Sequence, residues 1–356
     1  MKDGDRGPGS GDRGEHNPAL VWVSRTLEVV NRAGRALYAH GVLRVHRAGV
    51  PVISVGNIAM GGTGKTPLVA ALAGALLRHG ARPAIVTRGY QRRDARPRLV
   101  VNEPGARWEE IGDEPAVLAR ALPAVPIVVD ANRARGAATA VGETGATHLI
   151  LDDGFQHWRL ARDLDVVTLD PLDALCERRL RREHPRALAN ADAAVVIDAS
   201  PEALAGARTL LAAIAPTLKL FPCRLQATGV VLGADRYDAA WLHGRRVLAF
   251  AGIANPQRFA ATLSALGAEV AECQAFSDHH AYAAAEVAGI LGRADALGAT
   301  PVTTAKDAVK LAAAELQHIA WLAVELEPVE GDFLDLLRPV LPGGSPRAQE
   351  PLESKW

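Results

Sequence analysis

Short apolar, β-branched runs alternate with alanine- and leucine-rich stretches along most of this chain. The runs have the length of buried strands, and the stretches between them have the length of helices. A first series of runs comprises Val50–Gly56, Pro83–Thr87, Ile127–Asp130, His148–Asp152, Asp165–Leu169 and Ala193–Ile197. Helices are expected between them, for example over Thr66–His79, Glu114–Leu122 and Ala131–Gly142. This alternation is typical of a doubly wound, mostly parallel α/β sheet.

A second, shorter series follows at Val247–Ile253, Ala268–Cys273, Pro301–Thr304 and Ile319–Glu325. At 356 residues the chain is longer than one compact core usually holds, which favours two domains. We expect a first domain over residues 49–217 and a second, smaller α/β domain over 232–342. Residues 218–231 carry two short strand-like runs and are expected to be the linker.

The two ends of the chain differ from this pattern. Residues 1–17 are Gly-rich and charged with few apolar side chains, so we expect a disordered tail, and a second tail over 343–356. Between 18 and 48, apolar residues recur at helical spacing from Leu20 to Leu43, with arginines on another side. Such an amphipathic helix either packs on the domain behind it or lies in a membrane interface. The pattern alone leaves both open.

Composition narrows the function classes. Hydrophobic residues make up 49% and charged residues 22%, which excludes wholesale disorder, and the net charge of zero gives no general attraction to nucleic acid. Cys176, Cys223 and Cys273 are far apart and follow no disulfide or metal pattern, so a reducing cytoplasm is expected. No apolar run is long enough to cross a bilayer or to form a signal peptide.

The strongest local motif is a phosphate-binding loop between the first predicted strand and its helix. It reads Gly61-Gly62-Thr63-Gly64-Lys65-Thr66. Glycines there let backbone N–H groups turn toward a polyphosphate, Lys65 neutralises it, and the Thr66 hydroxyl is a Mg²⁺ ligand. Ala59 stands where the strict pattern has glycine, and Gly61 and Gly62 still allow the turn. Lys65 is one of only six lysines in the chain.

A phosphate loop also needs a carboxylate at the end of a neighbouring strand to hold the metal. Asp152 and Asp153 directly follow the apolar run that starts at His148. Paired acids at a strand end are more often turn formers, but the loop upstream favours the metal function. The sequence therefore predicts a site for ATP and Mg²⁺.

Two classes of nucleotide-binding protein are disfavoured, because the residues typical of them are missing. No guanine-binding motif is found, since Lys306-Asp307 lacks its spacing, and Met60 stands where partitioning ATPases carry a lysine. Three further polar clusters interrupt apolar surroundings, at 112–115, 153–157 and 278–280. Taken alone, Asp113 fits a helix cap and His279 fits a surface histidine.

Taken together, the motifs resemble those of one family, the lipid A 4′-kinases (tetraacyldisaccharide 4′-kinases) of Gram-negative bacteria. The matching stretches are PVISVGN with GGTGKTP (51–67), TRGYQRR (87–93), GDEP (112–115), DDGFQH (152–157), AFAGIANPQRF (249–259), FSDHHAY (276–282) and VTTAKDAVKL (302–311). They follow one another in order over most of residues 51–311, so the match is not confined to the phosphate loop.

The resemblance implies a two-domain P-loop kinase that is peripheral to the cytoplasmic face of the inner membrane. Such enzymes transfer the γ-phosphate of ATP, with Mg²⁺, to the 4′-hydroxyl of a tetraacylated glucosamine disaccharide 1-phosphate. The family's catalytic dyad maps onto Asp113 and His279, with Lys65 as the catalytic lysine. Because the two dyad residues lie in different halves, domain closure on the substrates is expected to assemble them.

The resemblance also implies the remaining site residues. The nucleotide-binding set is Gly61, Gly62, Thr63, Gly64, Lys65 and Thr66; the metal set is Thr66, Asp152 and Glu183; the substrate and active-site-loop set is Arg88, Asp153, His157 and Arg182. The family usually has Gly-Pro-Leu-Arg-Glu where this chain has Arg179-Leu-Arg-Arg-Glu183. The expected partners are the lipid disaccharide and the cytoplasmic membrane surface, with no nucleic acid and no obligate protein partner.

Other functions stay open at this point. One is a P-loop kinase with a soluble small-molecule acceptor, and another is a non-catalytic, nucleotide-dependent switch. A third is a paralogue that keeps the fold without activity, against which the intact Lys65, Thr66, Asp113, Asp152 and His279 argue.

Overall fold

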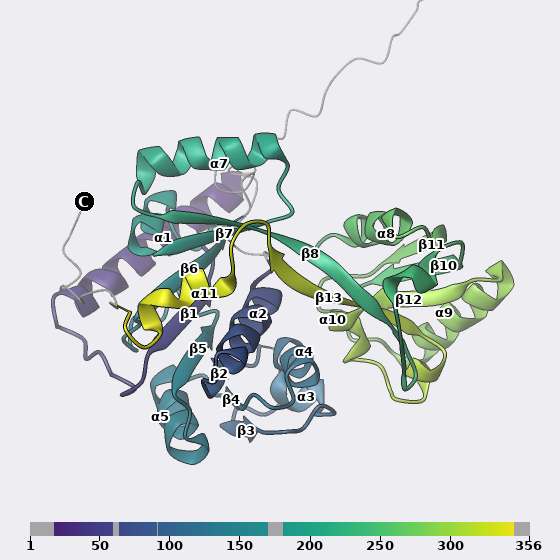
Figure 1. Ribbon diagram of the computed structural model, residues 1–356, viewed down its shortest axis with the longest axis horizontal. Coiled ribbons are helices and arrows are strands. Elements are labelled where there is room, and N and C mark those ends of the chain that lie inside the picture. The colour runs from purple at the N-terminus through teal and green to yellow at the C-terminus, as the bar shows by residue number, and fades with distance from the viewer. Residues whose placement is uncertain (1–17, 60–63, 91, 170–180, 345–356) are drawn as a thin grey trace, which may run out of the picture.

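The computed structural model describes residues 18–59, 64–90, 92–169 and 181–344. Within them a single sheet runs in the order β11-β10-β12-β13-β8-β7-β6-β1-β5-β2-β4-β3, with β9 beside β8 (Figure 1). The strands are β1 (Val52–Gly56), β2 (Pro83–Thr87), β3 (Arg98–Val100), β4 (Ile127–Val129), β5 (His148–Asp152), β6 (Leu164–Leu169), β7 (Ala193–Ile197), β8 (Lys219–Leu232), β9 (Asp235–Tyr237), β10 (Arg246–Ala251), β11 (Glu269–Ala275), β12 (Thr300–Thr304) and β13 (Ala320–Pro328).

Helices connect these strands. They are α1 (Pro18–Ala39), α2 (Lys65–Arg78), α3 (Trp108–Ile111), α4 (Asp113–Ala121), α5 (Arg133–Thr144), α7 (Pro201–Ile214), α8 (Pro256–Ala265), α9 (Ala284–Leu297), α10 (Ala305–Ala308) and α11 (Phe333–Leu337). The predicted fold class, α/β with a doubly wound and mostly parallel sheet, is confirmed. The predicted strands agree with the observed ones to within one or two residues at most ends, as at β2, β5 and β7.

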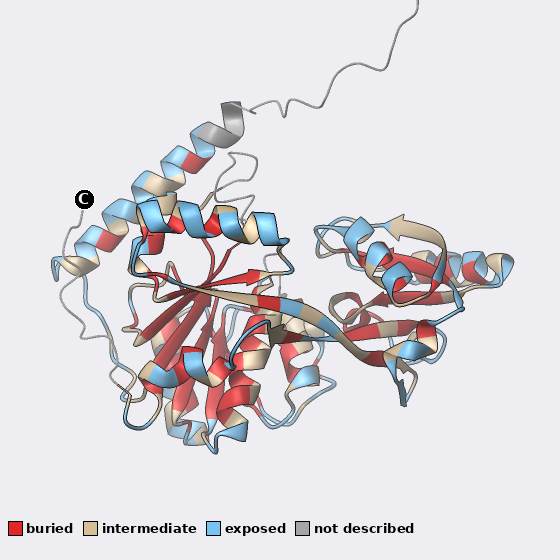
Figure 2. Ribbon diagram, turned by 45° about the horizontal axis from the view of Figure 1, so that its top comes forward, coloured by how far each residue is buried: buried red, intermediate tan, exposed pale blue. Residues whose placement is uncertain are grey.

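In the first half of the sheet, parallel strands are covered on both faces. Every residue of β1, β2, β5 and β6 is buried, as Figure 2 shows for the centre of this half. Helices α2, α4 and α11 share one core with one face of these strands, and α5 packs on the opposite face of β2, β4 and β5. Runs of Val, Ile and Leu bury both faces of a strand, which explains why they lack polar alternation. The phosphate-loop helix α2 therefore starts at the carboxyl edge of a rigid sheet.

The second half repeats this arrangement around β10, with α8 in the core of one face and α9 in the core of the other. Strands β8 and β13 pair antiparallel from Cys223 to Val231 and join the two halves, as Figure 1 shows. The segment expected to be a linker with two short strand-like runs is one strand of 14 residues. The sheet is therefore continuous from one half to the other.

The N-terminal helix α1 confirms the amphipathic helix expected near Leu20–Leu43, although it ends at Ala39. The expected tail over 1–17 lies outside the described residues, as does the expected tail over 343–356 apart from Gly343 and Gly344. Among the helices of the described ranges, none combines the length and the hydropathy that crossing a membrane requires.

Candidate active site

The phosphate loop ends in a helix, as predicted. Gly64 is the N-cap of α2 with φ of 81°, a left-handed conformation that favours glycine, and Lys65 and Thr66 open the helix. A Cβ on Gly64 would clash with Ile197 Cδ1, so β7 packs directly against Gly64. Gly61, Gly62, Thr63 and the neighbouring Met60 lie outside the described residues, so their nucleotide-binding function stays a prediction.

Asp152 lies at the carboxyl end of β5, beside the strand that leads into the loop. It is 1% exposed, and its Oδ2 accepts a hydrogen bond of 2.8 Å from the Thr87 hydroxyl. Its Oδ1 is buried with no hydrogen-bond partner among the described residues. Burial, together with the neighbouring carboxylate of Asp153, raises the pKa of Asp152. A buried carboxylate oxygen without a donor is suited to accept a cation.

Asp153 follows in the left-handed region, with φ of 54°. Its carboxylate lies 3.4 Å from Lys65 Nζ and accepts hydrogen bonds of 2.7 and 2.8 Å from Arg182. Burial opposes ionisation, but Lys65 and Arg182 outweigh it and lower the pKa of Asp153. The structure therefore brings Asp153, Lys65 and Arg182 together at the start of α2, and their functions in binding stay predictions.

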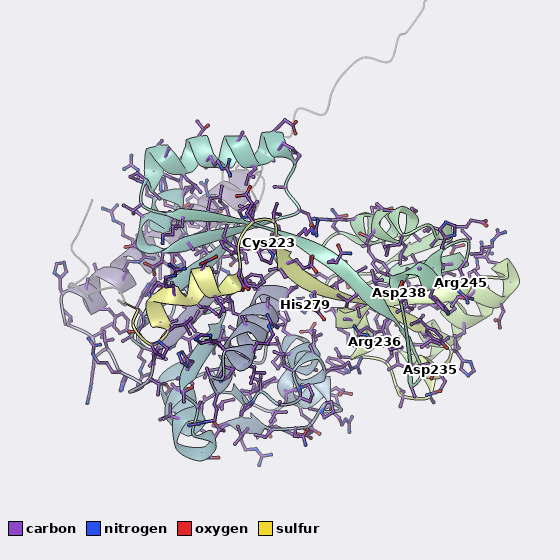
Figure 3. All side chains as sticks on the ribbon, viewed as in Figure 1. Cys223, Asp235, Arg236, Asp238, Arg245 and His279 are labelled. Atoms are coloured by element: carbon purple, nitrogen blue, oxygen red, sulfur yellow. The ribbon has the colours of Figure 1, made fainter. Side chains whose placement is uncertain are left out.

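The dyad is formed in the structure. His279 Nδ1 lies 2.6 Å from Asp113 Oδ2, although 166 positions separate the two residues in the chain. Asp113 begins α4 after Gly112, and its Oδ1 accepts the N–H of Glu114. His279 has φ of 62° and donates its backbone N–H to the Gly252 carbonyl, which fixes the ring toward Asp113. Figure 3 places His279 where the two halves meet. The expectation that domain closure on the substrates assembles the two residues stays a prediction.

The electrostatics keep Asp113 charged. Burial opposes its ionisation, but His279, Lys306 and Lys310 outweigh the burial and lower the pKa of Asp113. Lys310 Nζ is 3.8 Å from Asp113 Oδ2, and its side chain has no exposed surface. Lys306 Nζ lies 3.2 Å from His279 Nε2. The ionised form of a carboxylate is the one that can accept a proton.

Glu114 is a site residue that the sequence analysis missed. Burial, and then the charge of Asp152, raises its pKa to about 7. Its carboxyl thus lies within electrostatic reach of Asp152 and Lys65, which connects the GDEP cluster to the phosphate loop. Lys306 and Lys310 were missed as well. Glu114, Lys306 and Lys310 lie in the stretches GDEP and VTTAKDAVKL, which carry the family resemblance. That resemblance is the sequence signal that could have indicated them.

Arg88 and His157, both expected at the active-site loop, have different surroundings. Arg88 is exposed, directly after Thr87 at the end of β2. His157 is half-buried, and its Nε2 has no hydrogen-bond partner among the described residues. Burial, and then the charge of Arg133, lowers the pKa of His157 to about 4. Their expected contacts with substrate stay predictions.

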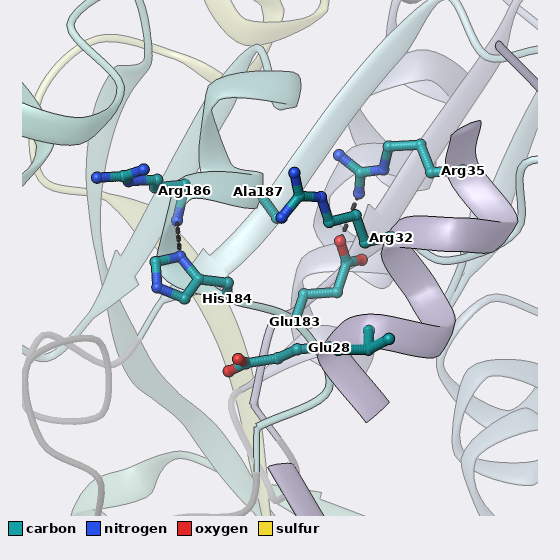
Figure 4. A pocket seen from close by; sticks show the side chains of 8 residues that line it. Glu28, Arg32, Arg35, Glu183, His184, Arg186 and Ala187 are labelled. Atoms are coloured by element: carbon teal, nitrogen blue, oxygen red, sulfur yellow. Dashed lines mark hydrogen bonds and ion pairs between the residues drawn. The ribbon is translucent and has the colours of Figure 1, made fainter. Parts of the chain in front are cut away.

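Glu183, the third expected metal ligand, is engaged elsewhere. Its Oε2 accepts a hydrogen bond of 2.5 Å from Arg35 of α1, and its Oε1 accepts one of 3.0 Å from Gln156. This pair borders a pocket between α1 and residues 183–187, shown in Figure 4. The lining residues are Glu28, Val29, Arg32, Arg35, Glu183, His184, Arg186 and Ala187. These contacts favour a structural function for Glu183, and its metal function stays a prediction.

The donor set fits Mg²⁺ held jointly with a nucleotide. No group of three His, Cys, Asp or Glu side chains that could hold a metal by itself occurs in the part of the chain that the structure describes. Mg²⁺ is usually bound by one or two carboxylates together with substrate phosphates and water. Asp152 offers the free Oδ1, and Thr66 lies at the start of the helix beside it.

Comparison with known proteins identifies the family of the chain. The family model for Tetraacyldisaccharide-1-P 4'-kinase (LpxK) matches residues 17–341. Tetraacyldisaccharide 4'-kinases of Anaeromyxobacter dehalogenans (strain 2CP-C) and Rhodospirillum rubrum are 44% and 40% identical to the chain, covering 83% and 82% of it and 82% and 86% of their own lengths. The crystal structure of LpxK from Aquifex aeolicus in complex with ATP matches with a TM-score of 0.71 and 29% identity, covering 91% of this chain and 98% of that one. The chain therefore belongs to the tetraacyldisaccharide-1-P 4'-kinase family.

Proposed function

We propose that this protein is a lipid kinase that transfers the γ-phosphate of ATP to the 4′-hydroxyl of tetraacyldisaccharide 1-phosphate in lipid A biosynthesis. The observation that carries the proposal is the contact of 2.6 Å between Asp113 and His279, which joins the two halves next to the phosphate-loop helix. Family membership supplies the acceptor, since the relatives carry this activity in their names.

In the transfer, the 4′-hydroxyl oxygen attacks the γ-phosphorus, its O–H bond breaks, and ADP leaves with the electrons of the broken O–P bond. Asp113 accepts the hydroxyl proton, because its lowered pKa keeps it in the ionised form that can take up a proton and its Oδ2 faces the junction between the halves. Lys65 neutralises the transferred phosphoryl group once ATP displaces Asp153 from its side chain.

A bound Mg²⁺ would be held by Asp152 and Thr66 and would supply charge neutralisation at the β- and γ-phosphates. Thr87 and Arg133 hold Asp152 in place for this ion. Thr87 donates to Asp152 Oδ2 and leaves Oδ1 free, and Arg133 Nη2 approaches the Asp152 carbonyl at 3.4 Å. Removal of divalent ions by EDTA is expected to abolish transfer, and Mg²⁺ is expected to restore it.

For the membrane, we propose that α1 attaches the protein to the cytoplasmic face of the bacterial inner membrane. Its outer surface exposes Trp22 at 72%, Val29 at 67% and Val30 at 61%. Apolar side chains on one face of a helix with arginines beside them are typical of interfacial helices. The double variant Trp22→Ser/Val30→Ser should lose sedimentation with anionic liposomes, whereas the exposed pair Val324→Ser/Val329→Ser should not. Equal sedimentation of the two variants would contradict this attachment.

The activity is tested by transfer of labelled γ-phosphate from Mg·ATP to tetraacyldisaccharide 1-phosphate in mixed micelles, with Lys65→Ala as the control. A labelled lipid that disappears in the variant establishes the kinase. If ATP binds and no lipid is labelled, a soluble acceptor or a nucleotide-dependent switch takes the place of this proposal.

A further inference from the structure

The histidine of the dyad has a cation on its second ring nitrogen. Lys306 Nζ lies 3.2 Å from His279 Nε2 and donates a hydrogen bond of 2.8 Å to Asp278 Oδ1. The carboxylate of Asp278 also accepts the backbone N–H of His279 at 3.0 Å. The ammonium group is therefore held in place by the residue that precedes the histidine, and it faces the side of the ring that points away from Asp113.

This arrangement limits which nitrogen carries the proton. An ammonium group has only donors, so the atom that Lys306 contacts must accept. Nε2 then has its lone pair free, and the single ring proton is on Nδ1, where Asp113 Oδ2 at 2.6 Å accepts it. An N–H on Nε2 would point at the ammonium group. Lys306 thus selects the tautomer with the proton on Nδ1.

The other groups around the ring agree with this assignment. Asp113 from α4 accepts from Nδ1, and Lys310 approaches the same carboxylate at 3.8 Å, so it reduces the charge that would attract a second ring proton. Tyr90 lies edge-on to the ring with centroids 5.8 Å apart and brings no charge. The remaining acid, Asp278, is already engaged with Lys306. No described carboxylate other than Asp113 and Asp278 forms an ion pair with His279.

We propose that Lys306 is a positioning residue that holds His279 as the neutral Nδ1–H tautomer, so that His279 orients Asp113 and does not carry the substrate proton. With Nδ1 already protonated and Nε2 facing Lys306, the ring has no place for the proton of the acceptor hydroxyl. That proton is transferred to Asp113. The tautomer is a property of the protein itself, whereas its effect on turnover rests on the proposed kinase function.

The tautomer is read directly by long-range ¹H–¹⁵N spectra of protein labelled at the histidine rings, with His279→Gln identifying the signal. At neutral pH, the expected spectrum shows His279 with a protonated Nδ1 and an unprotonated Nε2. A protonated Nε2 in the native protein overturns the proposal. In Lys306→Met nothing donates to Nε2, so the spectrum is expected to show the Nε2–H tautomer beside the Nδ1–H tautomer, and an unchanged His279 signal in this variant also overturns the proposal.

Kinetics give the second readout. Lys306→Met should lower kcat roughly tenfold or more with the KM for ATP unchanged. Lys306→Arg, which keeps a charged donor, should recover most of kcat. Lys219→Met is the matched control, because Lys219 is an exposed lysine at the start of β8. A rise in the KM for ATP with no change of kcat would assign Lys306 to the nucleotide instead.

These outcomes separate the inference from the proposed function. If the native protein labels no lipid but shows the expected tautomer, the kinase proposal fails and the assignment of Lys306 stands. If lipid is labelled and Nε2 is protonated, the kinase stands and the assignment of Lys306 fails. The native spectrum does not depend on Lys306→Met, so a poorly folded Lys306→Met protein does not remove the test.

Discussion

Asp113 shows how one residue is prepared for its function by neighbours from both halves of the chain. Its own helix supplies the Glu114 N–H to Oδ1, and the second half supplies His279 and Lys310 to Oδ2. All three stabilise the charged carboxylate, which is 5% exposed. A side chain this buried would otherwise resist ionisation. These partners therefore keep a buried acid ionised at neutral pH, as its proposed function as a base requires.

The first prediction concerns this carboxylate. Asp113→Asn keeps the shape of the side chain and removes its basicity, so kcat should fall roughly 100- to 10,000-fold. The KM for ATP should stay within about twofold, because a base acts in the transition state and not in nucleotide binding. Steady-state rates with the lipid acceptor and ATP titrations of the same preparation measure both. An equal loss of ATP affinity would move Asp113 from base to nucleotide ligand.

The second prediction concerns pH and His157. Burial and nearby arginines lower the pKa of His157 to about 4 from an ordinary 6.5. The unfolded chain takes up a proton below about pH 6.5 that the folded protein refuses, so this contribution to stability is complete above pH 6.5 and is lost as the pH falls to 4. His157→Asn should reduce that loss by about 2 kcal/mol, since the ring is only half-buried. Urea unfolding at pH 7 and pH 4 measures it; parallel pH curves for the two proteins would contradict it.

At the scale of elements, local pattern predicted most strands because each is a short, fully buried run. Strands β2, β5 and β7 begin and end where the sequence indicated. The pattern failed at β8, where Gly229 and Pro222 interrupt what is one continuous strand. Its partner β13 sets that strand through antiparallel pairing about 100 positions away, which no local window contains.

The site divides in the same way. The positions of Lys65 at a helix start and of Asp152 at a strand end could be predicted, because the loop and the strand each carry their own sequence pattern. The contact of Asp113 with His279 came from the family resemblance. The partners of Glu183 and of His279, namely Arg35 and Lys306, arise only when separate elements pack together. Periodicity marks Arg35 as one more polar position on a helix and gives no sign that it is 6% exposed.

The third prediction concerns how α1 is attached to the body of the protein. Arg35 pairs with Glu183 at 2.5 Å, with both side chains less than a tenth exposed, and its guanidinium lies over Phe155 and Trp158. Arg35→Met leaves a buried carboxylate without its cation, so the free energy of unfolding should fall by about 3–5 kcal/mol. The double variant Arg35→Met/Glu183→Gln should recover most of that loss. Chemical denaturation of both proteins decides it, and equal losses would show that Glu183 does not depend on Arg35.

At the scale of the whole molecule, two strands and a few side chains set the angle between the halves. Strands β8 and β13 form the continuous connection, and the dyad closes one side. A further contact joins Asp198, directly after β7, to Arg258 of α8 at 2.6 Å. Because His279 is carried by the second half and Asp113 by the first, their contact depends on this angle. The geometry of the proposed catalytic pair thus depends on how the whole sheet holds its two halves.

The last prediction tests this with two ion pairs of matched exposure. Arg258 and Asp198 are 54% and 28% exposed and lie in different halves, whereas Arg293 and Glu272, at 50% and 28%, both lie in the second half. Exposed pairs contribute under about 1 kcal/mol, so Arg258→Ala and Arg293→Ala should unfold at nearly the same denaturant concentration. Only Arg258→Ala should lower kcat, by about 3- to 10-fold, because small displacements of reacting groups are costly. Equal kcat values in the two variants would mean that β8 and β13 alone hold the halves in register.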